Sequence, residues 1–395
     1  MATALFAWEL GAGLGHIAQF FPLADALSGR GHRVFAALRD LSKAPTLFAR
    51  SGATVLQAPY KPPLPRGPVD TPRTYAHVLW NAGFGDPSEL QTLTQAWATL
   101  LDLINPDLVV FDHSPTALLA ARGRPVRRVL LGNGFSCPPE CRSFPDLRRW
   151  LPQEPERLHK DEQFVLDNVN SVLRLRRQQS LHCLAQLFQE VDEVFLSTFP
   201  EFDHYPVRNG VRYRGPWSIP GGGQPIWPEG RGKRIYAYLA PFPNLAKVLN
   251  LLRASGCPTI ISSGGIDPEL PRRFAAPNVH FEPKRLDLDR VAAECDLAVL
   301  NGNHATTLRM LLAGKPALQL PIFLEQGLNA IATVQLGAGL SPFPRSPEPV
   351  PLQFRSLLES ERYAESARRF AVRHADFDPQ RQVAAMLDRI DELLR

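Results

Sequence analysis

Residues 4–38 read ALFAWELGAGLGHIAQFFPLADALSGRGHRVFAAL and contain the pattern that decides the fold. The short apolar run Ala4–Trp8 predicts a strand, and the glycines at 11–15 end it. Apolar residues then recur at helical spacing over Ile17–Leu27, and Arg33–Leu38 predicts a second strand. A strand, a glycine loop, a helix and a second strand in this order predict a parallel β-α-β unit.

The same alternation of short apolar strands and helices continues along the chain and is interrupted once. The interruption, RGPWSIPGGGQPIWPEGRG at Arg214–Gly232, is dense in proline and glycine and predicts an interdomain linker. We therefore expect two doubly wound, Rossmann-like α/β domains that face a central cleft, because open parallel sheets bind ligands beyond the carboxyl ends of their strands. The predicted parts are an N-terminal domain over 1–214, a linker over 215–232, a C-terminal domain over 233–354, and helices over 355–395 that can pack back on the first domain.

Composition excludes several classes of protein. With 44% hydrophobic and 21% charged residues, the 395-residue chain is typical of a globular protein. The net charge of +5 comes from 44 basic and 39 acidic residues without a long run of one sign, which argues against a nucleic-acid partner.

The N-terminus carries Glu9 inside its apolar stretch and does not resemble a signal peptide, and no apolar run is long enough to span a membrane. Five cysteines, an odd number, are expected as reduced thiols in the cytoplasm, and the oligomeric state is left open.

The glycine loop supplies the first candidate for chemistry. The dinucleotide-binding fingerprint G-x-G-x-x-G ends in glycine. In this chain Gly11 and Gly13 match its first two glycines, but His16 occupies its last position, which weakens a dehydrogenase interpretation. At a helix N-terminus the imidazolium is disfavoured, so the neutral ring can accept a proton. The alternative is a histidine that only caps the helix or packs at the turn.

Asp112 is the second candidate, at the carboxyl end of the predicted strand Leu108–Phe111. Because parallel strands end at one edge of a sheet, we expect Asp112 to meet His16. A carboxylate on one imidazole nitrogen fixes the tautomer and stabilises the imidazolium formed at the other nitrogen. Alternatively, Asp112 or Ser114 caps the helix that begins at Pro115, and His113 competes for any catalytic role.

The second half contains a candidate anion site after the predicted strand Leu297–Leu300. Small and hydroxylated residues at Asn301–Thr307 open the next helix, where free N–H groups, the helix dipole and hydroxyls suit a pyrophosphate. Farther on, Glu325 and Gln326 can accept and donate hydrogen bonds to sugar hydroxyls. The alternative is two ordinary strand–helix turns with threonine caps.

Together these segments resemble the family 1 GT-B glycosyltransferases, of the UDP-glycosyltransferase and macrolide-glycosyltransferase type. Five segments carry the resemblance, in the order that the family has them: Gly15-His16 with Pro22–Leu27 and Gly31-His32-x-Val34; PDLVVFD at Pro106–Asp112; Ser197–Pro216; Asp296–Pro316; and Glu325–Ala330. The resemblance implies that His16 is the general base and that Asp112 is its partner. It implies no metal and no cofactor, because the nucleoside diphosphate sugar is a co-substrate.

The implied reaction is inverting and metal-independent transfer of a sugar from a UDP or dTDP donor to a hydroxyl of a hydrophobic small molecule. The donor-binding residues expected on this basis are Gly302, Asn303, His304, Thr306, Thr307, Glu325, Gln326, Pro241 and Phe242. The acceptor is expected against apolar groups in the irregular loops of the first half, with Trp80, Phe84 and Phe135 as the candidates.

The chain departs from the family in four segments of the donor site. Asn301-Gly302-Asn303 stands for His-Gly-Gly, and Arg309 stands where a ribose-binding Glu is frequent. Leu239–Phe242 replaces a Ser-Leu-Gly-Thr loop, and Phe281–Lys284 replaces Trp-x-Pro-Gln. These departures leave two alternatives open. One is a lipid-linked sugar transferase that docks on the membrane surface, with Phe144–Leu151 as the candidate patch, and the other is a catalytically silent sugar-nucleotide-binding partner protein.

Overall fold

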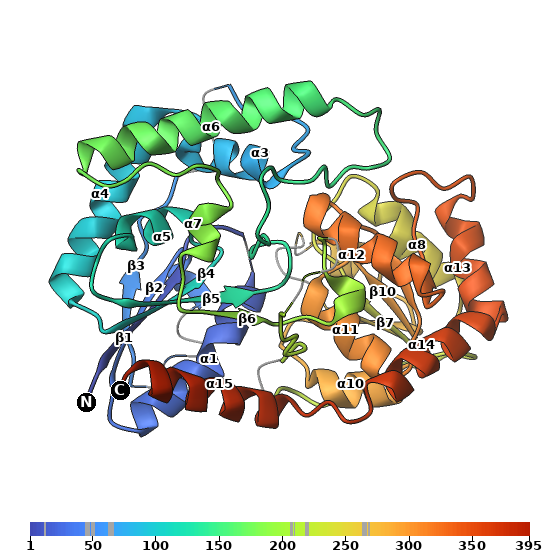
Figure 1. Ribbon diagram of the computed structural model, residues 1–395. Coiled ribbons are helices and arrows are strands. Elements are labelled where there is room, and N and C mark those ends of the chain that lie inside the picture. Colours follow the sequence, from blue (N-terminus) through green and yellow to red (C-terminus); the bar gives the residue numbers. More distant parts are fainter. Residues whose placement is uncertain are drawn as a thin grey trace. The chain divides into compact units, whose positions relative to one another are not determined.

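The computed structural model divides the chain into two compact units (Figure 1). Unit 1 comprises Met1–Ile219 and Asp378–Arg395, and unit 2 comprises Pro220–Phe377. The structure describes residues 1–11, 13–43, 48, 52–61, 67–205, 208, 210–217, 221–262, 267 and 269–395. Residues 218–220 of the predicted linker lie outside this set.

Within the described residues, unit 1 contains a six-stranded parallel sheet in the order β3-β2-β1-β4-β5-β6. Its strands are β3 (Thr54–Gln57), β2 (Arg33–Leu38), β1 (Thr3–Trp8), β4 (Leu108–Asp112), β5 (Arg127–Gly132) and β6 (Glu193–Leu196). The order reverses direction between β1 and β4. In doubly wound sheets this switch point is where ligands bind, beyond the carboxyl ends of the strands.

Helices cover both faces of the unit 1 sheet. They are α1 (Leu14–Gly29), α3 (Tyr75–Leu79), α4 (Pro87–Ile104), α5 (Pro115–Ala121), α6 (Pro155–Leu175), α7 (Gln186–Gln189) and α15 (Pro379–Leu393). Short helical turns lie at η1 (Leu41–Lys43), η2 (Trp80–Phe84) and η3 (Pro200–Phe202). In Figure 1, α1 and α15 lie on one face of the sheet and α4 and α5 on the other.

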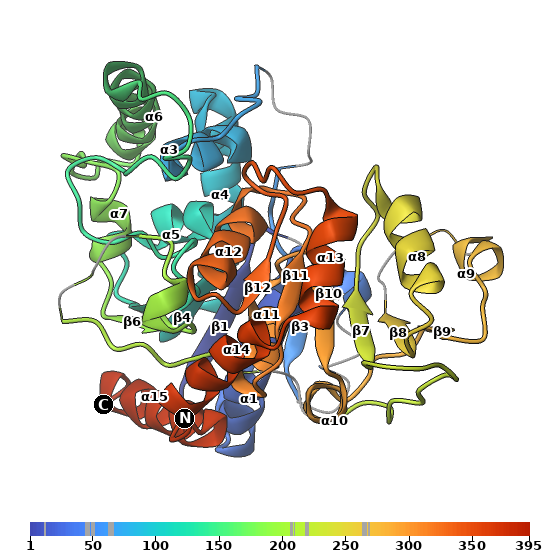
Figure 2. The ribbon, with the colours of Figure 1, turned by 90° about the vertical axis from the view of Figure 1, so that its right-hand side faces the viewer.

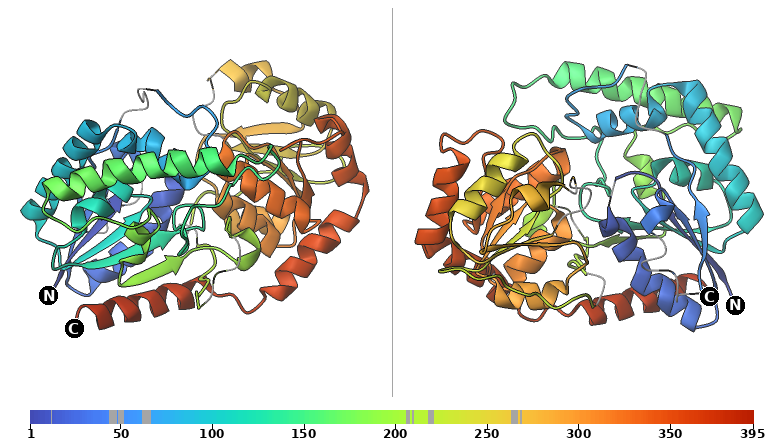
Figure 3. Two further views of the ribbon diagram at one scale, coloured as in Figure 1. Left: turned by 45° about the horizontal axis from the view of Figure 1, so that its top comes forward. Right: turned by 180° about the vertical axis from the view of Figure 1, so that it is seen from behind.

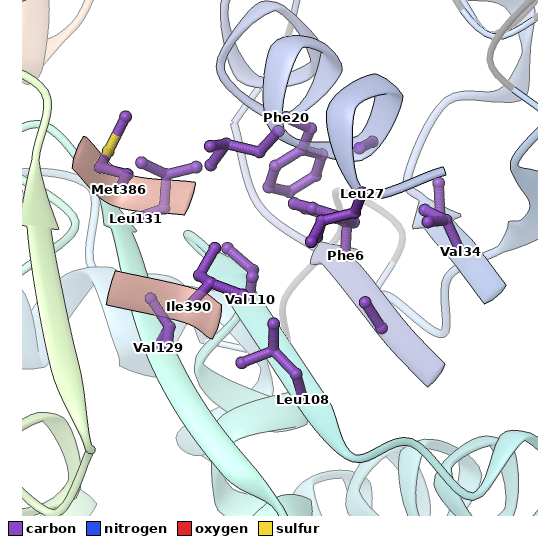
Figure 4. Close-up of a cluster of buried hydrophobic side chains, with 14 of the residues drawn as sticks. Phe6, Phe20, Leu27, Val34, Leu108, Val110, Val129, Leu131, Met386 and Ile390 are labelled. Atoms are coloured by element: carbon purple, nitrogen blue, oxygen red, sulfur yellow. The ribbon is translucent and has the colours of Figure 1, made fainter. Parts of the chain in front are cut away.

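The C-terminal helix α15 belongs to the core of unit 1. Asp378 caps it by accepting hydrogen bonds from the backbone N–H groups of Gln380 and Arg381, and a proline occupies its first turn. One helical turn apart, Met386 and Ile390 are fully buried against strand residues such as Val110 (Figure 4). Both chain ends therefore lie in the same unit, close to each other in both views of Figure 3.

Unit 2 repeats this topology in its described residues, with the parallel order β12-β11-β10-β7-β8-β9 (Figure 2). The strands are β12 (Gly339–Leu340), β11 (Ala317–Gln319), β10 (Leu297–Leu300), β7 (Ile235–Tyr238), β8 (Thr259–Ser262) and β9 (Val279–Glu282). Counted along the chain, this is the order of unit 1, so the second switch point lies between β7 and β10. The predicted fold, two Rossmann-like doubly wound domains, is confirmed.

Seven helices are described in unit 2. They are α8 (Leu245–Ala254), α9 (Glu269–Arg273), α10 (Leu288–Glu294), α11 (His304–Leu312), α12 (Leu324–Gln335), α13 (Val350–Glu359) and α14 (Arg362–Arg373). Successive strand residues point to opposite faces, so Val299 and Ala298 lie in different hydrophobic clusters. In the part of the chain that the structure describes, no helix has the length and apolarity to cross a membrane.

Candidate active site

His16 and Asp112 come together at the switch point of unit 1. His16 lies in the first turn of α1, and Asp112 ends β4, where Trp8 of β1 is its register partner. The imidazole Nδ1 lies 2.9 Å from Oδ2 of Asp112. Adjacent parallel strands thus bring the glycine loop after β1 to the carboxylate that ends β4.

Burial and ring stacking orient this pair. The Asp112 side chain is 1% exposed and that of His16 is 17% exposed, so the carboxylate is shielded while the imidazole reaches solvent. The His16 ring stacks on Trp8, with 5.4 Å between ring centroids and 19° between planes. When Nδ1–H donates to Asp112, the lone pair lies on Nε2, and a proton accepted there is stabilised by the carboxylate.

The loop before His16 leaves room for its ring only because Gly11 has no side chain. A Cβ at Gly11 would lie 2.2 Å from Nε2 of His16, and the backbone there has a φ of +87°. The guanidinium of Arg39 donates to the Gly11 carbonyl at 2.8 Å and fixes the loop from the end of β2. Ala12, in the same loop, lies outside the described residues.

His113, the predicted competitor, is poorly suited to be the base. Its side chain is buried, with Tyr75 and Phe135 rings each 6.0 Å away. Burial, reinforced by the nearby His16 and Arg39, lowers the pKa of His113 from 6.5 to about 3. An imidazole with so low a proton affinity takes little part in proton transfer near neutral pH.

Neither Asp112 nor Ser114 is the side chain that caps α5. Ser114 occupies the N-cap position without a side-chain capping bond. The capping group is instead Glu9, which follows β1 and whose Oε2 accepts from the N–H of Thr116 at 2.9 Å. Glu9 is wholly buried, and burial raises its pKa from 4.5 to about 7. Sequence reasoning missed this role, although a charged residue directly after an apolar strand was the available signal.

The three predicted acceptor residues occupy different environments. Phe135 is buried and packs edge-on against Tyr75 and His113, and the His113 ring lies 6.1 Å from the His16 ring. Phe84 is completely buried, so it supports the interior. The Trp80 ring lies 4.5 Å from that of Phe164 on α6. Of the three, Phe135 has the ring contacts that connect it to the His16 neighbourhood.

In unit 2, Asn301 ties together the loops at the switch point. Its Nδ2 donates to the Leu320 carbonyl at 2.7 Å, and its Oδ1 accepts from the Ala240 N–H at 2.6 Å. The side chain is 1% exposed. The residue that stands for the family's histidine therefore holds the ends of β7, β10 and β11 in place.

Gly302 and Gln326 are in close contact. A Cβ at Gly302, whose φ is +80°, would lie 2.4 Å from the Gln326 carbonyl oxygen. Asn329 donates to the Gly302 carbonyl at 2.9 Å, and the Gln326 Oε1 accepts from the Ile322 N–H at 2.9 Å. Two predicted donor-binding segments are thus joined into one backbone cradle.

The predicted pyrophosphate seat is the N-terminus of α11. Asn303 is its N-cap and makes no side-chain capping bond, and His304 is the first helical residue. The first N–H groups of a helix have no partner within it, which favours an anion. Thr306 and Thr307 are buried, and the Thr307 hydroxyl accepts from Gln319 at 3.2 Å, so that hydroxyl supports the interior.

The other predicted donor residues flank this helix end. Glu325 lies half-buried in the first turn of α12. Pro241 is exposed, and Phe242 packs against the hydrophobic cluster of α8. Arg309, which stands where the family often has a glutamate, forms an ion pair with Asp289 of α10.

Comparison with curated proteins gives a relative of similar length. The chain is 27% identical over 341 residues to a "PGL/p-HBAD biosynthesis glycosyltransferase" of Mycobacterium tuberculosis, covering 78% of this chain and 77% of that protein. No family model matches the chain.

Solved structures of glycosyltransferases match over nearly the whole chain. Glycosyltransferase VinC in complex with dTDP has a TM-score of 0.67 at 16% identity, covering 99% of this chain and 100% of that one. Spinosyn rhamnosyltransferase SpnG complexed with spinosyn aglycone has a TM-score of 0.62 at 14% identity, again covering 99% and 100%. The chain therefore has the GT-B fold of these glycosyltransferases and is similar in sequence to a curated glycosyltransferase, in agreement with the family that its motifs resemble.

Proposed function

We propose that the protein transfers a sugar from a nucleoside diphosphate donor to a hydroxyl of a hydrophobic small molecule, with inversion at the anomeric carbon. The observation that carries this proposal is the contact between His16 and Asp112. A partly exposed imidazole, oriented by a buried carboxylate, is the arrangement that general-base activation of a hydroxyl requires.

In the proposed reaction, Nε2 of His16 takes the proton of the acceptor hydroxyl. The acceptor oxygen attacks the anomeric carbon as the bond from that carbon to the phosphate oxygen breaks. One displacement of this kind inverts the anomeric configuration. Asp112 then stabilises the imidazolium, which lowers the barrier to proton transfer.

Donor binding is proposed at the α11 N-terminus of unit 2. Backbone N–H groups and the helix dipole there suit a diphosphate that gains charge as it leaves, so we propose that no metal is needed. Glu325 and Gln326, in the first turn of α12, would bind the sugar hydroxyls. The dTDP complex of VinC supports a UDP- or dTDP-linked sugar as the donor.

A hydrophobic acceptor is proposed from the aromatic surroundings of His16. Tyr75 and Phe135 pack around His113, which is adjacent to the His16 ring. The spinosyn aglycone complex of SpnG supports an aglycone-like acceptor. Trp80, whose ring packs on that of Phe164, and the buried Phe84 would contribute by supporting the segment that directly follows Tyr75 and its helix.

The test is a panel of UDP- and dTDP-sugars incubated with hydrophobic hydroxylated acceptors. Release of free nucleoside diphosphate is measured for the wild type and for His16→Ala, with and without EDTA, and the anomeric configuration of the product is determined by NMR. We expect one donor class to be turned over with inversion and without loss in EDTA, and His16→Ala to lose about 10²-fold or more in kcat. Binding of a donor without turnover by the wild type would instead favour a silent binding protein, and turnover only with lipid vesicles would favour a membrane-surface enzyme.

A further inference from the structure

The turn between Asp112 and α5 is strained and needs outside support. His113, directly after Asp112, has a φ of +43°, in the left-handed region that side chains other than glycine seldom occupy. Such a conformation costs about 1–3 kcal/mol and persists only where neighbouring structure imposes it. The position of the Asp112 carboxylate therefore depends on what holds this turn.

The support comes from the end of β1. The Leu10 N–H donates to the His113 carbonyl at 2.9 Å. The Glu9 Oε2 accepts from the N–H groups of Thr116 at 2.9 Å and Ala117 at 3.4 Å. Glu9 thus holds the beginning of α5 in place, while Leu10 holds the strained residue His113.

The same short segment also supports the other member of the pair. Trp8, just before Glu9, lies under the His16 ring, and its Nε1 donates to the Leu10 carbonyl at 2.7 Å. Three consecutive residues, 8–10, therefore contact the His16 ring, the residue after Asp112 and the beginning of α5. Among them Glu9 stands out, because a carboxyl group with no exposed surface is costly to keep in a hydrophobic interior.

We propose that Glu9 is a positioning residue for the His16–Asp112 pair, acting as the cap of α5 and thereby fixing the turn that carries Asp112. The inference rests on the proposed function, since it assigns Glu9 to the same reaction. Glu9 acts through hydrogen bonding by Oε2, so its length matters more than its charge. A greater effect of side-chain length than of charge would indicate a positioning role, whereas a greater effect of charge would indicate an acid–base role.

Three variants separate these roles. Glu9→Asp keeps the charge but shortens the side chain by about 1.5 Å, which withdraws the oxygen from Thr116. Glu9→Gln keeps the length and a carbonyl oxygen that can still accept. Glu162→Asp is the matched control, because Glu162 is also buried in unit 1 and accepts from the Phe144 N–H at 3.0 Å.

We expect Glu9→Asp to lower kcat by about tenfold to 10²-fold, because a shift of the His16–Asp112 pair by up to about 1 Å has an effect of this size. The KM for the donor is expected to change by less than about twofold. Glu9→Gln is expected to retain most of kcat, and Glu162→Asp to stay within about twofold of the wild type. Equal losses in Glu9→Asp and Glu162→Asp would overturn the proposal. So would a loss in Glu9→Gln as large as that in Glu9→Asp, because charge would then matter more than length.

A second readout does not need catalysis. The His16 imidazole signals are followed by NMR on histidine-labelled protein and assigned with His16→Ala. We expect the His16 signals to shift in Glu9→Asp and to stay unchanged in Glu162→Asp; unchanged signals in Glu9→Asp would count against the proposal. If the wild type turned over no donor, the proposed function would fail while this measurement still decided the role of Glu9.

Discussion

Nδ1 of His16 lies 2.9 Å from Oδ2 of Asp112, although 96 positions separate the two residues in the chain. The contact exists because β1 and β4 are neighbours in the sheet, with Trp8 in register with Asp112. A pair formed in this way depends on sheet registration, so it tolerates changes in the intervening residues but not changes at the two strand ends.

Asp112→Asn is expected to reduce kcat by about 10³-fold while leaving the fold and KM for the donor nearly unchanged. The amide can donate to Nδ1, which then holds the lone pair and leaves Nε2 protonated and unable to act as a base. Steady-state kinetics with a turned-over donor measure the effect. Asp107→Asn, at the opposite end of β4, is the matched control, because the Asp107 carboxylate accepts a hydrogen bond from the Thr3 N–H there, far from His16 in the sheet register. Comparable losses in the two variants would contradict the assigned role of Asp112.

Gly11→Ala is expected to lower kcat by about 10²-fold or more, because the new methyl group would displace Nε2 of His16. Gly13→Ala is a closely matched control. Its φ of +89° equals that of Gly11 within 2°, but a Cβ there meets no atom within 4 Å. Both variants place a side chain at nearly the same positive φ, so a loss of activity in Gly11→Ala beyond that in Gly13→Ala reports the collision with the imidazole. If the two variants kept equal activity, the position of the His16 ring would need revision.

The fold could be predicted from sequence because its signals are local. Apolar runs such as Leu297–Leu300, followed by small residues and a helix, identify a β-α unit without knowledge of its neighbours. Elements with weaker patterns were not predicted. They include the edge strand Thr54–Gln57, whose end residues are exposed, and the two-residue strand Gly339–Leu340. Edge strands bury less apolar surface, so their sequences carry a weaker pattern.

The site could be predicted only where topology alone brings residues together. His16 and Asp112 follow from the rule that parallel strands end at one edge. The bridging by Asn301 and the capping by Glu9 depend on which side-chain atoms face which loop, and sequence spacing does not determine that. Thr307 illustrates the same limit, because its position in the helix turns its hydroxyl toward Gln319.

Gly302→Ala is expected to weaken binding of UDP and dTDP by about tenfold or more, measured by calorimetry. Its Cβ would collide with the Gln326 backbone, and neither chain segment can move aside without opening the cradle. Gly256→Ala, also in unit 2, has a φ of +69° and no atom within 4 Å of the added Cβ. It controls for backbone strain, which costs about 1–2 kcal/mol in either variant. Equal nucleotide affinity in both variants would argue against a donor site at this turn.

Glu9 is expected to make the protein less stable as pH rises, in contrast to a typical salt-bridged carboxylate. Because burial raises its pKa from 4.5 to about 7, the folded state keeps the proton in a window where the unfolded state has lost it. Its contribution to stability is therefore complete below about pH 4.5 and is lost as the pH rises through about 7. The separation of the two pKa values corresponds to about 3 kcal/mol.

Glu9→Gln removes this titration and leaves the other groups in place, so the free energy of unfolding of the variant minus that of the wild type isolates the effect. We expect this difference to become more positive by about 2–3 kcal/mol between pH 5 and pH 8. Chemical denaturation of both proteins at several pH values measures it. His113, whose pKa is lowered to about 3, and Glu162, whose pKa burial raises, titrate in both proteins and cancel. A difference that stays constant over this range would mean that Glu9 is ionised in the folded protein throughout, and that the helix start it caps stabilises the carboxylate more than burial destabilises it.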